Sequence, residues 1–321
     1  MKTTWTCRSS KENHETPQKA VIVTDYGHPM SFGLSLDPDA DRLPQTRQLA
    51  RAAADGGLDI LAVQDHAYQP GHLDAWTLIT HLATQTGRIS FLTDVADLQL
   101  RPPAMLANAA ASLGVLAEGR IILGVGGGAF ADAIAGMGGG RRTGREMVAY
   151  TEQALHIMRA ALTGGAVRLH SDQHAIEGYT AGPVPASPIP LWLGSQGPRM
   201  LAVTGRSSDG WISPLNIYVP PDEVPAKQKI IDDAARSAGR DPAAIRRIYN
   251  VIGVIGDVRR GRGLVGDVRL WTETLTVWAT ELGFDTFIFW PMTAPLSQLA
   301  VFAAEVVPAV REQVGQIRGR R

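Results

Sequence analysis

An aspartate and a histidine directly follow a short apolar segment, Ile60-Leu61-Ala62-Val63-Gln64-Asp65-His66. A short unbroken apolar run bounded by turn residues is typical of a strand buried on both faces. In parallel α/β folds ligands bind at the carboxyl ends of the strands, where Asp65 and His66 are expected to lie. The ordinary pKa of histidine is close to neutrality, so His66 is a candidate proton carrier. The alternative is that Asp65 caps the next turn and His66 is a surface histidine.

A glycine-rich segment, Leu123-Gly124-Val125-Gly126-Gly127-Gly128-Ala129, ends a second apolar strand. It matches the dinucleotide-binding pattern G-x-G-x-x-G/A. That pattern requires a helix directly after the glycines and an acid at the end of the next strand, about 20 residues on. Here the glycines continue to Gly140, and the residues at that distance, Arg145 and Glu146, begin a helix. A Rossmann fold is therefore a minor alternative, and the glycines indicate the close approach of a ligand or a mobile lid.

A third segment, Leu191-Trp192-Leu193-Gly194-Ser195-Gln196-Gly197-Pro198-Arg199, predicts an anion site. A strand ends, small residues turn, and Pro198 begins a helix whose free backbone N–H groups and dipole attract negative charge. Late strands of a (β/α)₈ barrel often supply such a phosphate site. One alternative is an ordinary turn between strand and helix, and another is an anion held by Arg141 and Arg142 in the glycine-rich loop.

The three segments belong to a regular alternation of strands and helices, which predicts an α/β fold with a parallel sheet. Eight strand–helix units close naturally into a single (β/α)₈ TIM barrel of roughly 250 residues. The strands are expected over Ser31–Leu36, Asp59–Gln64, Ile89–Val95, Arg120–Val125, Pro190–Gly194, Gly210–Pro214, Ile248–Ile255 and Thr286–Trp290. The helices are expected over Leu43–Asp55, Ala75–Gln85, Pro102–Ala117, Arg145–Leu162, Pro198–Gly205, Asp222–Ala238, Asp267–Leu282 and Leu296–Val310.

An insertion between the fourth and fifth strands, Ala166–Pro188, interrupts this spacing. It has too little apolar content for a domain, and we expect it to cross the barrel mouth. Its His170 and His174 match no metal-ligand spacing, so no metal is predicted. Residues 1–29 are expected to be a disordered N-terminal extension, because their first part is polar and aperiodic, and the barrel domain is placed at residues 30–321.

The composition narrows the class of protein. The 321 residues include 31 Lys plus Arg and 31 Asp plus Glu, which gives no general attraction to nucleic acid or to an anionic membrane. The one cysteine, Cys7, cannot form an internal disulfide, which is typical of a cytoplasmic protein. No apolar run is long enough to span a bilayer, and no signal peptide is apparent. The expected partner is a small-molecule substrate.

From Met30 to Val310 the chain resembles the bacterial luciferase-like superfamily of flavin- and deazaflavin-dependent oxidoreductases. Short motifs in the order of that superfamily carry the resemblance. They are Gly57-Leu58-Asp59 before Val63-Gln64-Asp65-His66, Pro102-Pro103-Ala104, Gly119-Arg120-Ile121-Ile122-Leu123-Gly124-Val125-Gly126, Leu191-Trp192-Leu193-Gly194, Gly205-Arg206-Ser207-Ser208-Asp209-Gly210-Trp211 and Gly283-Phe284-Asp285-Thr286-Phe287. Because they span nearly the whole barrel, they are specific to the superfamily rather than to one activity.

The resemblance implies a (β/α)₈ barrel that holds a flavin-like ring system in its mouth. The Asp-His pair is similar to that of the subgroup that uses the deazaflavin coenzyme F420. In that subgroup the aspartate contacts the ring system and the histidine lies near the hydride-carrying carbon, which implies cofactor binding by Asp65 and catalysis by His66. The other residues implied to bind the cofactor are a bulge with a non-prolyl cis peptide at Asp94 and Val95, a glycine turn at Gly126 and Gly127, and a phosphate turn at Ser195, Gln196, Gly197 and Pro198.

Two departures from the subgroup concern the substrate. Its dehydrogenase members place a glutamate in the loop after strand four and a tryptophan shortly after the histidine, whereas this chain has Ala129 and Pro70 nearest those positions. Dehydrogenation of a sugar phosphate is therefore not expected. The residues expected to line the mouth and contact the substrate are Tyr68 and Trp290, followed by Gln69, Trp76, Phe130 and Asn216.

The predicted function is hydride transfer between coenzyme F420 and an organic substrate, with His66 carrying the accompanying proton. An FMN-dependent, luciferase-like monooxygenase is the alternative among enzymes. A non-catalytic flavin-binding protein is the alternative of another class. Members of the superfamily are often homodimers, so a homodimer is expected on the resemblance alone.

Overall fold

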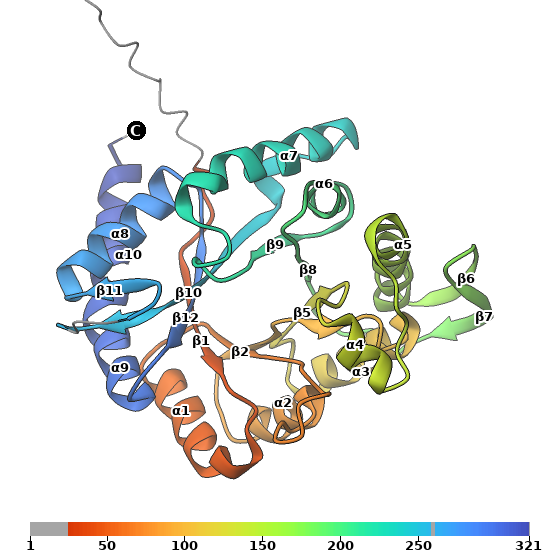
Figure 1. The fold of residues 1–321 in the computed structure, drawn as a ribbon, viewed down its shortest axis with the longest axis horizontal. Coiled ribbons are helices and arrows are strands. Elements are labelled where there is room, and N and C mark those ends of the chain that lie inside the picture. The colour runs from red at the N-terminus through yellow and green to blue at the C-terminus, as the bar shows by residue number, and fades with distance from the viewer. Residues whose placement is uncertain (1–24, 258–260, 321) are drawn as a thin grey trace, which may run out of the picture.

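Eight parallel strands form a closed ring in the computed structural model, which describes residues 25–257 and 261–320 (Figure 1). Around the ring the order is β1 (Ser31–Leu36), β2 (Ile60–Val63), β3 (Ser90–Thr93), β5 (Ile121–Gly126), β8 (Leu191–Gly194), β9 (Gly210–Ser213), β10 (Arg246–Ile255) and β12 (Thr286–Pro291). Pairing of β12 with β1 closes the ring. The expected α/β class and single (β/α)₈ TIM barrel are confirmed.

Helices cover the outside of the ring (Figure 1). They are α1 (Leu43–Asp55), α2 (Ala75–Ala83), α3 (Pro103–Leu116), α4 (Ala131–Gly136), α5 (Gly144–Thr163), α6 (Pro198–Ser207), α7 (Val224–Ser237), α8 (Val268–Thr280), α9 (Pro295–Val301) and α10 (Val307–Arg318). Two short strands extend the sheet, with β4 (Ala96–Asp97) beside β5 and β11 (Leu264–Gly266) beside β10. Among the helices of the described residues, none combines the length and the apolar character needed to cross a lipid bilayer.

The inside of the barrel is filled by bulky side chains that face glycines. A Cβ atom at Gly210 would lie 2.5 Å from Trp192, and one at Gly33 would lie 2.6 Å from Ile288. The interior is therefore a packed core rather than a pore, as in other barrels of this kind. Its cluster of buried apolar residues is Ile60, Ala62, Leu92, Trp192, Ile212, Ile248 and Ile288.

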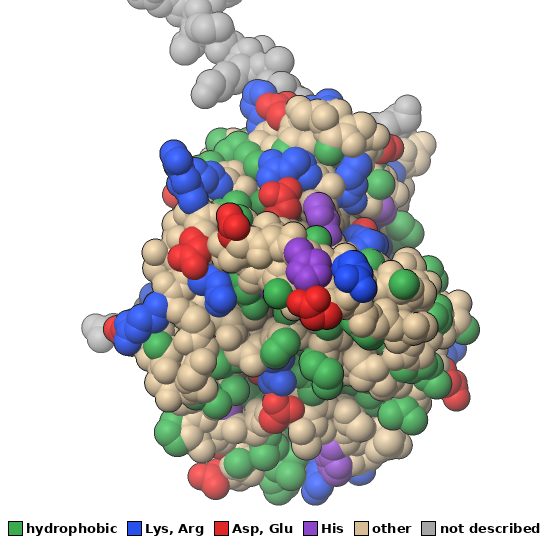
Figure 2. All heavy atoms as spheres, turned by 90° about the vertical axis from the view of Figure 1, so that its right-hand side faces the viewer, with side chains coloured by type: hydrophobic (Ala, Val, Ile, Leu, Met, Phe, Trp, Pro, Cys, Tyr) green, Lys and Arg blue, Asp and Glu red, His purple; other side chains and the backbone are tan. Residues whose placement is uncertain are grey.

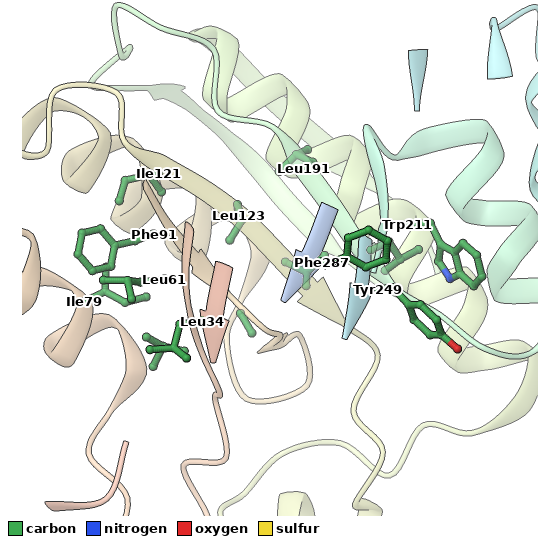
Figure 3. Packing of buried hydrophobic residues seen from close by; sticks show 14 of the residues in the cluster. Leu34, Leu61, Ile79, Phe91, Ile121, Leu123, Leu191, Trp211, Tyr249 and Phe287 are labelled. Carbon is green, nitrogen blue, oxygen red and sulfur yellow. The ribbon is translucent and has the colours of Figure 1, made fainter. Parts of the chain in front are cut away.

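The opposite faces of the same strands pack against the helices (Figure 3). Successive side chains of a strand point to opposite faces, so both faces of each barrel strand are buried. This explains why the strands appear in the sequence as unbroken apolar runs rather than as alternating patterns. Figure 3 shows part of this outer layer, including Leu34, Leu61, Phe91, Leu123, Leu191, Trp211, Tyr249 and Phe287.

The insertion forms an antiparallel hairpin of β6 (Gly165–His170) and β7 (Ala175–Ala181). The hairpin lies on the outer side of α5, away from the ring of strands (Figure 1). The rings of His174 and Tyr150 are 4.2 Å apart, and Ser171 Oγ donates a hydrogen bond to Gln153 of α5. The expectation that the insertion crosses the barrel mouth is wrong, because Val167 is buried in the outer core and holds the hairpin against α5. On the face that carries the hairpin, basic, acidic and hydrophobic side chains are interspersed (Figure 2).

The expected N-terminal extension lies mostly outside the described residues, which begin at Asp25. Residues 25–29 contact the helices at the amino-terminal end of the barrel. Arg318 Nε donates a hydrogen bond to Asp25 at 2.9 Å, and Arg318 Nη1 donates to the carbonyl oxygen of His28 at 2.7 Å. Tyr26 Oη donates to Asp232 of α7 at 2.9 Å. The packed part of the chain therefore begins before residue 30.

The structure differs from the expected elements mainly at the end of the third strand, in the last helix and in the glycine-rich loop. The third strand stops at Thr93 rather than at Val95, because the chain bulges there before it rejoins the sheet as β4. The last helix comprises α9, a π-helical turn over Phe302–Val306, and α10, which continues to Arg318 because Val314 is still buried. Helix α4 was not predicted, and the burial of Ile134 fixes it within the glycine-rich loop.

Candidate active site

The carboxyl ends of the parallel strands form one rim around the mouth of the barrel. Asp65 follows β2, Asp94 follows β3, Gly126 ends β5 and Ser195 follows β8. Trp290 lies in the last part of β12. Because all eight strands run in the same direction in a closed ring, these five residues share one end of the barrel, as predicted.

Asp65 forms a buried ion pair at this rim. Its side chain is 2% exposed, and Arg101 donates to its two carboxylate oxygens through Nε and Nη2, at 2.7 Å each. The backbone N–H of Asp97 donates to the same carboxylate at 3.3 Å. Arg101 also donates to Asp74, whose pKa its guanidinium helps to hold below the usual value against the effect of burial. Both oxygens of Asp65 are therefore already engaged within the protein.

His66 lies in a stack of rings. Its ring centroid is 5.5 Å from that of Tyr68 and 6.4 Å from that of His72, with near-parallel planes. Phe130, from the loop after β5, meets the His66 ring edge-on at 5.6 Å. Burial and the neighbouring His72 lower the pKa of His66. At neutral pH His66 is therefore uncharged and able to accept a proton.

The bulge after β3 forms the floor of the mouth. The peptide between Asp94 and Val95 is cis, as predicted. Val95 lies over two neighbouring strand ends, because a Cβ atom would come within 2.6 Å of its side chain at Gly126 and within 3.2 Å at Gly194. Glycine is thus required at Gly126 to leave room for Val95. The result is an apolar surface between β5 and β8 at the level of the rim.

Polar groups continue this floor across the mouth. Asn250 of β10 donates from Nδ2 to Asp94 Oδ1 at 3.4 Å and accepts from Trp290 Nε1 at 2.8 Å. Burial raises the pKa of Asp94 to about 7. Its second oxygen, Oδ2, is buried and has no hydrogen-bond partner among the described residues. An apolar platform beside an unpartnered polar atom suits a planar ligand that carries hydrogen-bonding atoms, as a flavin or deazaflavin does.

The glycine turn after β5 is held from below. Gln99 donates from Nε2 to the carbonyl oxygen of Gly127 at 2.7 Å, and its own N–H donates to Asp97 at 2.8 Å. A Cβ atom at Gly127 would lie 2.9 Å from Met147 of α5. The turn is therefore fixed by close contact on its protein side and keeps its position at the rim.

The turn after β8 leads into α6 without a side-chain cap. Gly197 is the N-cap residue, Pro198 is the first residue of the helix, and no atom lies within 4 Å of the position of a Cβ on Gly197. The polar groups of Ser195 are occupied, since its hydroxyl pairs with Thr204 and its N–H donates to Ile212. Gln196 Nε2 donates to the carbonyl oxygen of Tyr218. The open part of this turn is thus the first turn of α6 rather than the Ser195 side chain.

Two grooves lie away from the rim. One, of about 530 Å³, is lined by α1 residues; the other, of about 440 Å³, lies between α2 and α3. Trp76, the second residue of α2, lines this second groove. Within residues 25–257 and 261–320, no three His, Cys, Asp or Glu side chains gather as a metal ion would require.

Sequence reasoning missed three residues of the site. Arg101 stands directly before the two prolines of α3, and Asn250 is a polar residue within the apolar strand Ile248–Ile255. Asn250 could have been found from the sequence, because a polar residue in a buried strand needs a partner. Arg101 could have been found as a charged residue at the start of a helix near the strand ends. His72 offered no comparable signal, since its position beside His66 depends on the course of the loop Ala67–Leu73.

The model of the family described as luciferase-like monooxygenase matches residues 24–260. The F420-dependent glucose-6-phosphate dehydrogenase of Gordonia bronchialis is 32% identical over 221 residues, which are 64% of this chain and 62% of that protein. The 5,10-methylenetetrahydromethanopterin reductase of Methanolobus tindarius is 31% identical over 217 residues, 67% of this chain and 63% of that protein. The chain thus spans a little over six-tenths of the length of these relatives.

Solved structures share the fold at lower identity. An F420-dependent secondary alcohol dehydrogenase in complex with an F420–acetone adduct superposes with a TM-score of 0.78 at 17% identity, covering 88% of this chain and 99% of that one. A long-chain alkane monooxygenase superposes with a TM-score of 0.73 at 13% identity, covering 91% and 92%. The family match, the barrel and the rim together show that the chain belongs to the luciferase-like monooxygenase family.

Proposed function

We propose that the protein is an oxidoreductase that transfers a hydride between coenzyme F420 and an uncharged organic substrate in the barrel mouth. The observation that carries the proposal is the position of His66, half-buried among aromatic rings on the strand end next to the Val95 platform. The F420-dependent glucose-6-phosphate dehydrogenase and the methylenetetrahydromethanopterin reductase among its relatives support it.

When bound, coenzyme F420 supplies the hydride-carrying carbon of the reaction. His66 accepts the proton that leaves the substrate when the substrate is oxidised, since its lowered pKa keeps the ring neutral at neutral pH. Val95, Gly126 and Gly127 form the surface that receives the ring system. Asp65 holds the loop that carries His66 through its ion pair with Arg101. Asp65 thus supports cofactor binding indirectly, by fixing the loop at the mouth of the barrel.

The phosphate of the cofactor binds at the first turn of α6. The N–H groups of that turn have no side-chain cap, and the helix dipole favours an anion there. Gly197 leaves the approach open because it has no side chain. Gln196 and Pro198 shape the turn, and Ser195 fixes it through Thr204. Arg141 is the weaker candidate for an anion, because it already pairs with Asp132.

The substrate contacts the aromatic side of the mouth. Tyr68 and Phe130 lie 5.8 Å apart and flank His66. Trp290 lies on β12, beside Asn250 of β10. Ala129 and Pro70 occupy the positions at which sugar-phosphate dehydrogenases of this subgroup carry a glutamate and a tryptophan. We therefore propose an uncharged substrate, such as an alcohol or a ketone, rather than a sugar phosphate.

Absorption titration of the purified protein with FMN and, separately, with the deazaflavin tests the cofactor. Tighter binding of the deazaflavin, together with substrate turnover that does not consume oxygen, is the expected result. A protein that holds FMN tightly and ignores the deazaflavin would overturn the proposal.

An FMN-dependent monooxygenase is the second candidate, favoured by the family match and by the long-chain alkane monooxygenase among its structural neighbours. Oxygen uptake with reduced FMN separates it from the first candidate. A non-catalytic flavin-binding protein is the candidate of another class. Reduction of bound cofactor by a trial alcohol would exclude that role.

A further inference from the structure

The Asp94 side chain points into the interior of the barrel. It contacts Asn250 of β10, and β10 is four strands away from β3 in either direction around the ring. A contact between diametrically opposite strands can form only through the interior. The Asp94 side chain is 9% exposed, so its carboxyl group lies inside the barrel at the level of the strand ends.

Trp290 determines which way Asn250 faces. An indole N–H is a donor only, so the Asn250 atom that meets Trp290 Nε1 at 2.8 Å must be the amide oxygen. The amide nitrogen of Asn250 then faces Asp94 Oδ1 at 3.4 Å and the carbonyl oxygen of Ser213 at 3.2 Å. Asp94 Oδ1 is therefore a hydrogen-bond acceptor.

Asp94 carries its proton below about pH 7, and above that pH the charged form predominates. Burial raises its pKa to about 7, and the Asn250 amide lowers it only in part. The ionisable groups on the neighbouring loops are Asp65, His66 and Asp97, and none of them shifts the pKa of Asp94. In the neutral acid the hydrogen is carried by Oδ2, because Oδ1 accepts from Asn250. In the described part of the chain this O–H group has no acceptor, and an unmet buried donor is costly.

We propose that neutral Asp94 is the hydrogen-bond donor of the ligand site and selects a planar ligand with an uncharged acceptor, a ring nitrogen or a carbonyl oxygen, lying on Val95. The inference rests on the proposed function, because it takes the ligand to be a flavin or deazaflavin ring. It adds a contact from the barrel interior, whereas the other candidate residues surround the mouth. It also explains why the floor of the mouth holds an acid where a small apolar residue would pack without cost.

Binding measured against pH tests this role. Dissociation constants of FMN and of the deazaflavin are measured from about pH 6 to about pH 9 for the wild type, Asp94→Asn and Asp94→Ala. An asparagine amide donates at every pH, so Asp94→Asn should bind with no step near neutrality. The wild type should lose affinity about tenfold per pH unit above its carboxyl pKa, relative to Asp94→Asn. Asp94→Ala should bind weakly throughout, and Asp55→Asn, at the end of α1, should match the wild type.

A second readout needs no ligand. The infrared carbonyl band of a protonated carboxylic acid should be present in the wild type below neutral pH and absent in Asp94→Asn. Identical pH profiles for wild type and Asp94→Asn would overturn the inference while leaving the proposed function intact, as would full affinity in Asp94→Ala. If neither probe binds any variant at any pH, the proposed function fails and the ligand contact of Asp94 fails with it.

Discussion

Arg101 donates hydrogen bonds to both carboxylate oxygens of Asp65, from Nε and Nη2 at 2.7 Å each. The two residues are 36 positions apart and join the loop after β2 to the start of α3. The same guanidinium reaches Asp74 at the start of α2. One arginine thus connects three segments around the loop that carries His66, which makes the pair a structural support of the site.

Removing Arg101 should destabilise the protein strongly. Arg101→Ala leaves the Asp65 carboxylate buried without its partner, and breaking a buried pair in this way costs roughly 3–5 kcal/mol. Urea unfolding measures the change. Asp74→Asn is the matched control, because it weakens the exposed arm of the same guanidinium and retains an N-cap residue for α2. The control should lose at most about 1 kcal/mol. Equal small losses in both variants would show that the Asp65 pair contributes little to stability.

His66 should be needed for the reaction and not for binding. His66→Ala should retain the affinity for the cofactor but slow turnover by about 10²–10⁴-fold if His66 moves the proton. Stopped-flow measurement of cofactor reduction separates this step from binding. His156→Ala, on the exposed side of α5, is the control. Turnover at the wild-type rate in His66→Ala would assign His66 a structural role.

The pH profile of the same reaction gives a second test of His66. Burial and His72 lower its pKa below the usual 6.5, so the base is already deprotonated at neutral pH. The rate of substrate oxidation should therefore be at its plateau at neutral pH and fall only in more acidic solution. His72→Asn removes a neighbour that lowers the pKa and should move the acidic limb of the profile toward higher pH. An unshifted acidic limb would show that the pH profile does not report the titration of His66.

The elements and the rim could be predicted from the sequence because they depend on local patterns. Each barrel strand is an unbroken apolar run, and parallel closure brings every strand end to the same side. The positions of Asp65, Asp94 and Ser195 on one rim follow from that alone. This conclusion requires only that the strands are parallel, and it does not depend on the register of their pairing.

The partners of these residues could not be predicted, because they depend on long-range geometry. Asp65 pairs with Arg101 across two loops, and Asp94 reaches Asn250 through the barrel interior. Neither distance follows from spacing in the chain. The placement of the hairpin was also missed, because its sequence shows too few apolar residues to reveal that Val167 packs in the outer core.

The oligomeric state can be tested at α3. Three large apolar side chains on this helix are strongly exposed: Met105 at 65%, Val115 at 52% and Leu116 at 74%. Exposed apolar residues at both ends of one helix suit a protein interface, and we propose that the expected homodimer forms here. Light scattering should give the mass of a dimer for the wild type and of a monomer for Leu116→Arg. Val277→Arg, on the outer face of α8, should remain a dimer. A monomeric wild type would remove the dimer from the proposal.

The stability of the protein should depend on Asp94 in a pH window set by its raised pKa. The carboxyl ionises near pH 3.8 when unfolded and at about 7 in the folded protein, so the folded state binds more protons between these values. Stability contributed by this group is therefore lost as the pH rises through the window. A shift of this size corresponds to roughly 4 kcal/mol, so above the window the free energy of unfolding of Asp94→Asn should exceed that of the wild type by up to that amount. Urea unfolding of both proteins across the window measures the difference in their free energies of unfolding, which should grow as the pH rises. A difference that does not change with pH would show that the pKa of Asp94 is not raised in the folded protein.

Gly197 should determine whether the phosphate of the cofactor is recognised. The residue caps α6 at φ −77° and ψ 151°, a conformation that any residue can adopt, and no atom lies within 4 Å of its Cβ position. Gly197→Val should therefore fold normally while its side chain blocks access to the free N–H groups of the helix. FMN and riboflavin differ only in the phosphate, so their affinity ratio isolates this contact. The wild type should bind FMN more tightly than riboflavin, and Gly197→Val should bind the two about equally, with riboflavin unaffected. Gly87→Val, at an open position between α2 and β3, controls for the effect of a bulky residue on a loop. An unchanged ratio in Gly197→Val would move the phosphate away from α6 and toward Arg141 and Arg142.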